Sequence, residues 1–149
     1  MDAQGYLLVP DHICPVCGSV AGFVLEARDK AIAYKGHTAI IPGLTLRYCT
    51  ACGEGFDAGN ADMQRMADTL QNFMRDIDAA QAAKLRATRK RLGLKQAEAA
   101  ALFGGGINAF SEYERGIRQP SKSTLLLLQL LDRHPELLAE VRQSAQVGA

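Results

Sequence analysis

The stretch "FGGGINAFSEYERG", residues 103–116, sets three glycines directly before a segment whose apolar and polar residues recur at helical spacing. At about 100° per residue, such a helix has one apolar side and one polar side. The apolar side holds Ile107, Phe110 and Tyr113, and the polar side holds Asn108, Ser111, Glu112 and Arg115. The stretch therefore predicts a short amphipathic helix from about Ile107 to Arg115.

Further short helices are predicted on both sides of this segment, because glycine and proline recur at the expected stops. The expected boundaries are a first helix ending at Leu92 before Gly93, a second over about 95–103, a third ending at Gly116, a fourth from Pro120-Ser121 to about Asp132, and a fifth opened by Pro135. Two short helices joined by a glycine-rich turn are typical of a helix-turn-helix. Residues 84–149 are predicted to form an all-α, five-helix domain of this kind.

The polar side of the third helix suits the edges of DNA bases. In helix-turn-helix proteins the second helix of the pair enters the major groove, and its N-terminal residues reach base edges. An Asn side chain can bond N6 and N7 of adenine together, whereas basic residues nearby can hold phosphates. The candidate DNA-binding residues are Lys95, Gln96, Asn108, Ser111, Glu112, Arg115 and Lys122, with Arg118 as a further phosphate contact. The alternative is an ordinary polar surface used for protein contacts.

Charge divides the chain into two parts. The 149 residues carry a net charge of +1, and 48% hydrophobic with 22% charged residues is the composition of a soluble globular protein of one or two small domains. From Lys84 onward there are 11 basic and 6 acidic residues, against 6 and 10 before it. The basic part suits a phosphate backbone, and the acidic part is better matched to a basic protein.

Four cysteines organise the first part. "CPVCG" at 14–18 and "CTACG" at 49–53 are two C-x-x-C motifs separated by 31 residues. The spacing predicts that Cys14, Cys17, Cys49 and Cys52 bind one metal ion, with zinc the leading choice, because tetrahedral zinc takes four thiolates and glycine after each motif permits the tight turn. Four protein ligands leave no position for water, so the ion is expected to be structural. The alternatives are iron in the same site, two disulfides, or a redox-active C-x-x-C.

The rest of the first part is predicted to be a small sheet followed by a helix. Residues 23–49 are rich in β-branched and aromatic residues and interrupted by Gly36 and Pro42-Gly43, which indicates about three short antiparallel strands, with His37 an exposed loop residue. Asn60 is the expected N-cap of a helix. Its apolar stripe, interpreted as core or an inter-domain contact and alternatively as a partner surface, holds Met63, Met66, Leu70, Phe73, Met74 and Ile77. The overall prediction is an α+β protein with a zinc-binding domain at 1–78. Residues 79–83 are predicted to be a linker of small and polar residues, either helical or flexible.

The sequence argues against export, membrane insertion and catalysis. Its start lacks a basic region followed by an apolar core, and no apolar run approaches the roughly 18 residues of a membrane span, so a cytoplasmic protein is expected. No Ser/His/Asp set or pair of acids is evident, and "GGG" lacks the Lys-Ser/Thr of a phosphate loop. We expect a protein that is not an enzyme.

Taken together, the paired C-x-x-C motifs, "FGGGINAFSEYERG" and "LLDRHPELL" resemble the MqsA family of bacterial antitoxins across nearly the whole chain. The resemblance implies an N-terminal zinc domain that binds an mRNA-cleaving toxin, and a C-terminal domain that dimerises and binds a palindrome in its own promoter. It matches residues 14, 17, 49 and 52 to the family's zinc cysteines and Asn108 to its base-reading Asn. The segment "LRATRKRLGLKQAEAAALFG" also resembles the broader Xre/Cro-like helix-turn-helix family.

Two features depart from the family pattern. Glu112 stands where the family has a base-reading Arg, and a glutamate either accepts a bond from cytosine N4 or pairs with Arg115 three residues on. The N-terminal extension, residues 1 to about 12, has no function that the sequence indicates.

Three functions are compatible with these patterns. The first is a dimeric antitoxin and autorepressor with one structural zinc per chain, whose acidic half masks a basic RNase and whose basic half occupies an operator. The second is a stand-alone zinc-containing helix-turn-helix regulator without a toxin. The third is an enzyme that uses the cysteines for thiol exchange.

Overall fold

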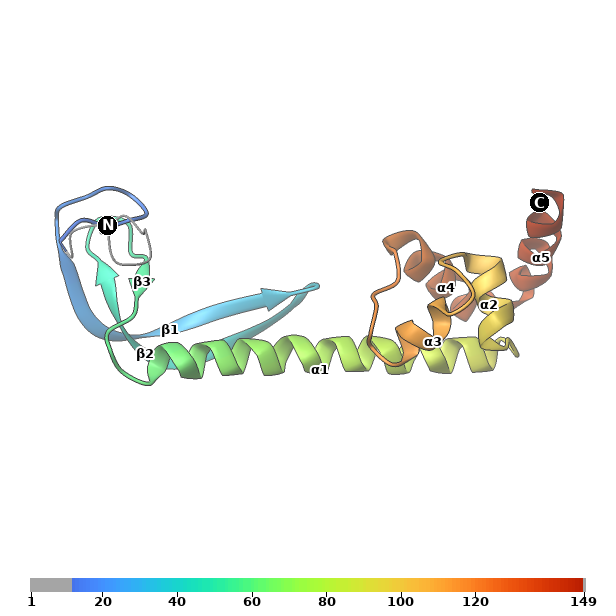
Figure 1. Ribbon diagram of the computed structural model, residues 1–149, viewed down its shortest axis with the longest axis horizontal. Helices are drawn as coiled ribbons and strands as arrows, with labels where there is room; N and C mark the ends of the chain where they lie inside the picture. The colour runs from blue at the N-terminus through green and yellow to red at the C-terminus, as the bar shows by residue number, and fades with distance from the viewer. Residues whose placement is uncertain (1–11, 149) are drawn as a thin grey trace, which may run out of the picture. The chain divides into compact units, whose positions relative to one another are not determined.

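The computed structural model describes residues 12–148, so residues 1–11 of the N-terminal extension lie outside it. The elements are β1 (Phe23–Tyr34), β2 (His37–Cys49), β3 (Gly55–Phe56), α1 (Asp62–Arg91), α2 (Gln96–Phe103), α3 (Ala109–Glu114), α4 (Lys122–Arg133), the 3-10 turn η1 (Pro135–Leu137) and α5 (Leu138–Val147) (Figure 1). A three-stranded antiparallel sheet followed by five α-helices confirms the α+β prediction. Two compact units divide between Met74 and Arg75. Among the described residues, no helix has both the length and the apolar character needed to cross a membrane.

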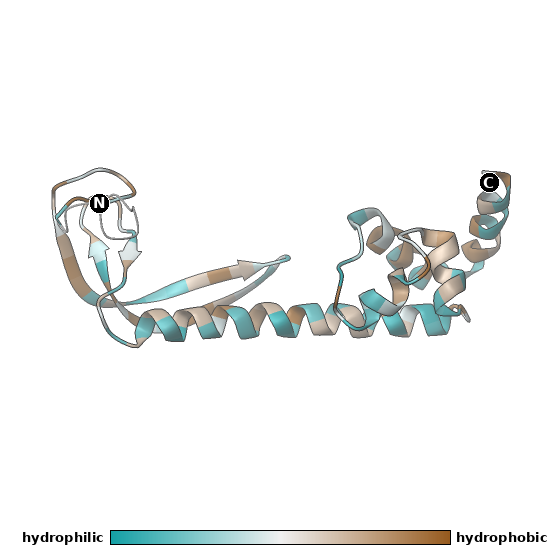
Figure 2. Ribbon diagram, in the orientation of Figure 1, coloured by the Kyte–Doolittle hydropathy of each residue, from teal (hydrophilic) through white to brown (hydrophobic). Residues whose placement is uncertain are grey.

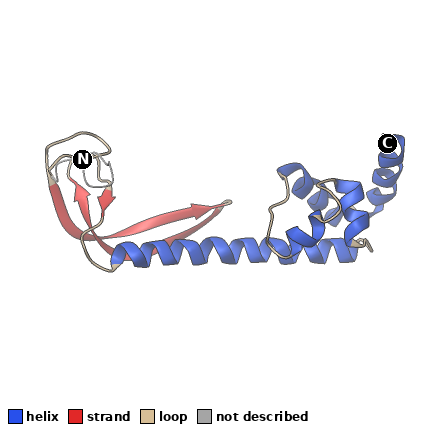
Figure 3. Ribbon diagram, viewed as in Figure 1, coloured by secondary structure: helices blue, strands red, loops and turns tan. Residues whose placement is uncertain are grey.

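The sheet is a long hairpin rather than three short strands between the cysteine motifs. β1 and β2 pair along 12 and 13 residues and turn only at Lys35-Gly36, while β3 follows the second motif (Figure 3). The expected break at Pro42-Gly43 is instead a bulge, because the register shifts opposite Asp29. The Asp29 carboxylate accepts a hydrogen bond from the Gly43 N–H at 2.9 Å, so a side chain supplies the partner that the strand ladder lacks there. His37 is exposed, as predicted, but it is the first residue of β2 rather than a loop residue.

Helix α1 covers one face of this hairpin. Asn60 lies just before the helix, where its side-chain oxygen accepts from the Asp62 N–H at 2.9 Å and its amide donates to the Thr45 carbonyl at 2.8 Å. The N-cap is Ala61, whose carbonyl accepts from the Arg65 N–H at 2.9 Å, so the predicted cap residue Asn60 lies one position earlier and ties the start of the helix to β2. The buried core of this unit is Ile32, Ile41, Leu44, Leu46 and Tyr48, packed against Met63, Met66, Leu70 and Phe73. The methionine-rich stripe is thus core at these four positions.

The predicted linker at 79–83 is helical. Residues 79–83 lie inside α1, so the helix that begins beside the sheet and the first helix predicted for the basic half are one 30-residue element (Figure 1). The segment "DIDAAQAAK" contains no glycine or proline, and its alanines favour helix. Figure 2 shows hydrophilic and hydrophobic residues interleaved along α1.

The second unit is a helical bundle around its own core. Buried residues come from every helix of the unit: Leu85, Leu94, Ala99, Ala100, Ala109, Phe110, Tyr113, Leu128, Leu131 and Leu138. The predicted helix ends are present at Gly93 and Gly116, which adopt φ of 70° and 73°. The predicted start of α4 is also present, because the Ser121 hydroxyl caps it by accepting from the Thr124 N–H at 3.1 Å. Ile107 is 79% exposed, so its assignment to the apolar side was wrong. Helix α3 begins only at Ala109, which leaves Ile107 in the turn after the glycines.

Candidate metal centre and candidate nucleic-acid interface

The two cysteine motifs fold into the same turn. In the first, the Cys14 N–H donates to the Ser19 carbonyl at 2.9 Å and the Gly18 N–H donates to the Cys14 carbonyl at 2.8 Å. The second repeats this pattern, with Cys49 bonded to the Glu54 carbonyl at 2.9 Å and Gly53 bonded to Cys49 at 2.8 Å. The glycines adopt φ of 70° and 76°, which other residues rarely adopt. The glycine after each motif therefore has the role that the sequence predicted.

The four sulfur atoms converge. The Cys14 and Cys52 sulfurs lie 3.7 Å apart, those of Cys17 and Cys49 lie 3.8 Å apart, and all four lie within 4.8 Å of one another. Metal–sulfur bonds of about 2.3 Å in a tetrahedron require sulfur–sulfur separations of about 3.8 Å. A disulfide bond would bring two sulfurs to about 2 Å, and these cysteines are free. The predicted four-cysteine cluster is confirmed as an arrangement that fits a metal ion.

The electrostatics of the cluster favour a cation. The backbone N–H of Cys52 is the main cause that lowers the pKa of Cys49, to about 6, with further help from the Ala51 N–H. For Cys52, the Glu54 N–H lowers the pKa, but desolvation and the three neighbouring thiols outweigh it and raise the pKa to about 12. Thiolates this close repel one another, so a cation at the centre lets all four ionise together.

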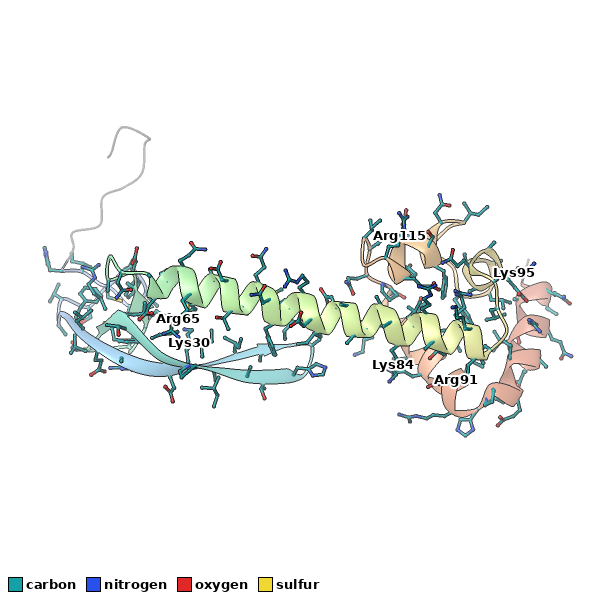
Figure 4. All side chains as sticks on the ribbon, turned by 90° about the horizontal axis from the view of Figure 1, so that it is seen from below. Lys30, Arg65, Lys84, Arg91, Lys95 and Arg115 are labelled. Atoms are coloured by element: carbon teal, nitrogen blue, oxygen red, sulfur yellow. The ribbon has the colours of Figure 1, made fainter. Side chains whose placement is uncertain are left out.

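The predicted DNA-binding residues belong to the second unit. Asn108 sits at the N-cap position of α3, is exposed, and makes no capping bond with its side chain. Lys95, Gln96, Asn108, Arg115 and Lys122 are exposed, and Ser111 and Glu112 are half-buried. In Figure 4, Arg115 lies on one side of α1 and Lys84 and Arg91 on the other. The positive charge of this unit is therefore not confined to one face.

Two of these residues have partners that the sequence did not indicate. Gln96 donates to the Glu114 carboxylate at 3.0 Å. Glu112 pairs with Arg118 at 3.0 Å, whereas Arg115 donates to the Ser111 carbonyl at 3.2 Å. Of the two alternatives for Glu112, the pairing with Arg115 is not found among the described residues, because Arg118 in the following loop reaches back to the helix.

A buried ion pair holds this region together and was missed in the sequence. Arg89 and Glu114, with side chains 10% and 4% exposed, form a two-pronged contact, and Arg89 also donates to the Leu94 carbonyl at 2.6 Å. Burial opposes ionisation of Glu114, but hydrogen bonds from Arg89 and Gln96 hold its pKa below the usual value. The pair connects α1 to α3, and Gln96 at the start of α2 also contacts it through Glu114. The sequence feature that could have indicated this pair is the placement of Arg89 and Glu114, each of which stands on the apolar side of its own helix.

The glycines before α3 all take unusual backbone conformations. Gly104, Gly105 and Gly106 adopt φ of 82°, 97° and 93°. A Cβ on Gly105 would lie 2.6 Å from the Tyr113 hydroxyl and 2.9 Å from the Ala109 Cβ. The turn therefore needs glycine at this position both for its conformation and for space, and it fixes where α3 begins.

The chain joins a four-cysteine sheet unit to a unit of short helices, and comparison with known proteins assigns it to the bacterial antitoxins. The family model described as "Antitoxin component of bacterial toxin-antitoxin system, MqsA" matches residues 12–142. The chain is also 38% identical over 131 residues to Antitoxin MqsA of Escherichia coli (strain K12), an alignment covering 87% of this chain and 98% of that protein. The chain belongs to the MqsA antitoxin family, which is a family of antitoxins and not of enzymes.

Proposed function

We propose that this antitoxin neutralises a basic, mRNA-cleaving toxin and represses its own operon by binding a palindromic operator as a homodimer in the cytoplasm. Residues 1–78 form the toxin-binding domain, 79–83 the connection and 84–149 the DNA-binding and dimerisation domain. The observation that carries the DNA-binding part is the polar side of α3, with Asn108 and Arg115 exposed at its two ends and Ser111 and Glu112 half-buried between them. The buried Arg89–Glu114 pair holds this helix in place. A rigid element presents base-reading groups with less loss of entropy than a mobile one.

The metal ion is proposed to be one structural zinc per chain. Four thiolates suit zinc, and the sulfur separations of 3.7 and 3.8 Å match its bond lengths. With Cys14, Cys17, Cys49 and Cys52 all engaged, no thiolate remains for exchange chemistry. Metal analysis of protein purified under reducing conditions should find about one zinc per chain. Iron, or no metal with exchangeable thiols, would contradict this assignment.

Each DNA-binding residue has a proposed role. Asn108 reads adenine from the start of α3, with Ser111 beside it on the same face. Lys95, Arg115 and Lys122 hold phosphates, while Gln96 donates to Glu114 and shares its remaining amide hydrogen with the backbone of DNA. Glu112 lies among them but is charge-neutralised by Arg118.

Dimerisation is proposed to use the leucine-rich surface of the second unit. Leu126 and Leu130 on α4 are 55% and 47% exposed, and Leu102 and Val141 lie half-buried nearby. Apolar side chains exposed together are a common mark of a protein interface. A two-fold dimer would present two copies of α3 to the two halves of a palindrome.

Binding to the DNA upstream of the gene, compared with scrambled DNA across a salt series, tests the proposal. We expect a specific affinity at least about a thousandfold tighter, which falls steeply as salt rises. Asn108→Ala should weaken specific binding by roughly 1 to 3 kcal/mol and leave non-specific binding nearly unchanged. No preference for the upstream DNA would overturn the repressor function, and equal losses on both DNAs would remove the base-reading role of Asn108.

The runner-up is a stand-alone regulator with the same DNA-binding unit and no toxin. A neighbouring gene for a small basic protein that co-purifies with this chain and is inhibited by it favours the antitoxin. The acidic first half, at 6 basic to 10 acidic residues before Lys84, is complementary to such a partner.

A further inference from the structure

Arg118 belongs to the loop between α3 and α4, but its side chain is held against α3 from several directions. Its Nε pairs with Glu112 Oε2 at 3.0 Å, and its Nη2 donates to the Gly105 carbonyl at 2.7 Å. Its guanidinium carbon lies 5.1 Å from the centre of the Tyr113 ring. A surface arginine normally samples many rotamers. Here an ion pair, a backbone carbonyl and an aromatic ring restrict the group, so its orientation is set before any ligand arrives.

One edge of this guanidinium remains available. Nη1 has no hydrogen bond among the described residues, and the side chain is 45% exposed. Glu112 follows Asn108 by four residues, so the two lie on the same side of the helix at its N-terminal end. The Arg118 guanidinium, which pairs with Glu112, therefore lies on the side of α3 that carries Asn108. Its free N–H groups form a planar fork that matches two acceptors side by side.

We propose that Arg118 is a specificity-determining residue that reads guanine, through O6 and N7, next to the base pair that Asn108 contacts. Glu112, Gly105 and Tyr113 are its positioning residues. In this arrangement the acidic side chain of Glu112 does not read a base and does not repel DNA strongly, because Arg118 neutralises it. The assignment rests on the proposed DNA-binding function and extends it. In this assignment Arg118 contacts a base instead of the phosphate that the sequence suggested.

The test is a set of operator duplexes in which each base pair is changed in turn, measured with wild type and with two variants. For wild type, replacement of one particular G·C pair should weaken binding about 5- to 150-fold. In Arg118→Ala, replacement of the same G·C pair should no longer change the affinity, whereas replacements at all other positions should weaken binding as much as they do in wild type. Arg118→Lys keeps the charge but lacks the planar fork, so it should lose the same discrimination while retaining the salt dependence of wild type.

Two controls separate this role from others. Glu112→Gln, which keeps the shape but weakens the anchor, should reduce the penalty at the same G·C pair and nowhere else. Arg115→Ala removes a neighbouring exposed arginine and should weaken binding to every duplex by a similar factor. Thermal melts of all variants report whether they fold.

Each outcome decides one question. If Arg118→Ala weakens all duplexes equally and lowers the salt slope by about 0.9, Arg118 is a phosphate contact and the proposal is overturned. It is also overturned if Arg118→Ala leaves every penalty unchanged. If wild type itself shows no preference for its upstream DNA, the proposed repressor function fails and this inference fails with it.

Discussion

The two units of this antitoxin hold their folds by different means. The first has five buried core residues on one face of a hairpin, together with four converging thiols. The second has ten buried core residues from all of its helices and a buried ion pair. With so small a core, the first unit is expected to depend on the metal ion that we propose for its thiols, whereas the second is stabilised by packing. The units should therefore respond to different perturbations.

The largest expected effect is on the first unit when a ligand of its proposed metal ion is removed. Cys49→Ser removes one of the two buried ligands, so the first unit should unfold while the helices of the second remain. Structural zinc sites contribute on the order of 10 kcal/mol or more of apparent binding free energy, which exceeds the stability of a small domain. Amide NMR of the full-length variant should show the β1–β2 signals collapsed and the signals of α2–α5 dispersed.

Val16→Ser is the control, because Val16 lies in the equivalent turn of the first cysteine motif, is 64% exposed and carries no thiol. It should leave both units folded. If the β1–β2 amide signals of Cys49→Ser also remain dispersed, a metal ion is not what stabilises the first unit. If Cys49→Ser collapses both units, their stabilities are not separable as proposed.

The second unit should instead be sensitive to its buried ion pair. Glu114→Ala leaves the Arg89 guanidinium buried without its partner, which typically costs about 3 to 5 kcal/mol. Denaturant unfolding of this unit should show that loss while the first unit keeps its metal. The exposed pair of Glu98 with Arg142 is the comparison, since its side chains are 41% and 46% exposed and Glu98→Ala should cost about 0 to 1 kcal/mol.

The acid dependence of stability gives a second measure of the same pair. The folded-state pKa of Glu114 is lowered, so its stabilising contribution is present above the usual glutamate pKa and is lost as pH falls through the folded value. Wild type should lose more stability than Glu114→Ala on acidification. Equal losses, or a cost of Glu114→Ala below about 1 kcal/mol, would show that the pair contributes little. Replacing both partners, as Arg89→Met with Glu114→Leu, should recover much of the loss.

The same contrast explains what the sequence could predict. The cysteine cluster follows from local spacing, since each C-x-x-C turn folds within six residues and only the meeting of the two turns is long-range. The ends of helices at Gly93 and Gly116 and the start of α4 at Ser121 follow from local sequence in the same way. The small polar residues 79–83 were compatible with either a helix or a flexible connection, and helix propensity agrees with the helix that forms there.

The missed features depend on contacts between distant residues. The Arg89–Glu114 pair joins positions 25 apart, and neither charge alone indicates a buried partner. Glu112 was matched to Arg115 because helical spacing favours residues three apart, yet the loop after α3 brings Arg118 closer. Pro42-Gly43 was read as a turn because both residues favour turns. Only pairing with β1 shows that Asp29 makes it a bulge.

The smallest expected difference concerns what glycine supplies in each unit. Gly18 in the first metal-binding turn has a positive φ of 70° with nothing within 4 Å of an added Cβ, so Gly18→Ala should cost about 1 to 2 kcal/mol from backbone strain alone. Gly106 has the same open surroundings at φ of 93°, and Gly106→Ala should behave alike. Gly105 differs, because an added Cβ would also meet the Tyr113 hydroxyl at 2.6 Å and the buried Ala109 Cβ at 2.9 Å.

Gly105→Ala should therefore cost about 1 to 3 kcal/mol more than Gly106→Ala in denaturant unfolding, because crowding adds to the backbone strain. It should also displace the start of α3 and weaken specific DNA binding more than non-specific binding. Equal costs at the two glycines would mean that Tyr113 and Ala109 yield easily, and that the helical unit is no more tightly packed at this turn than the metal-binding unit is at Gly18. An added cost at Gly105 alone would place the rigidity of the second unit in the contact between its glycine turn and α3.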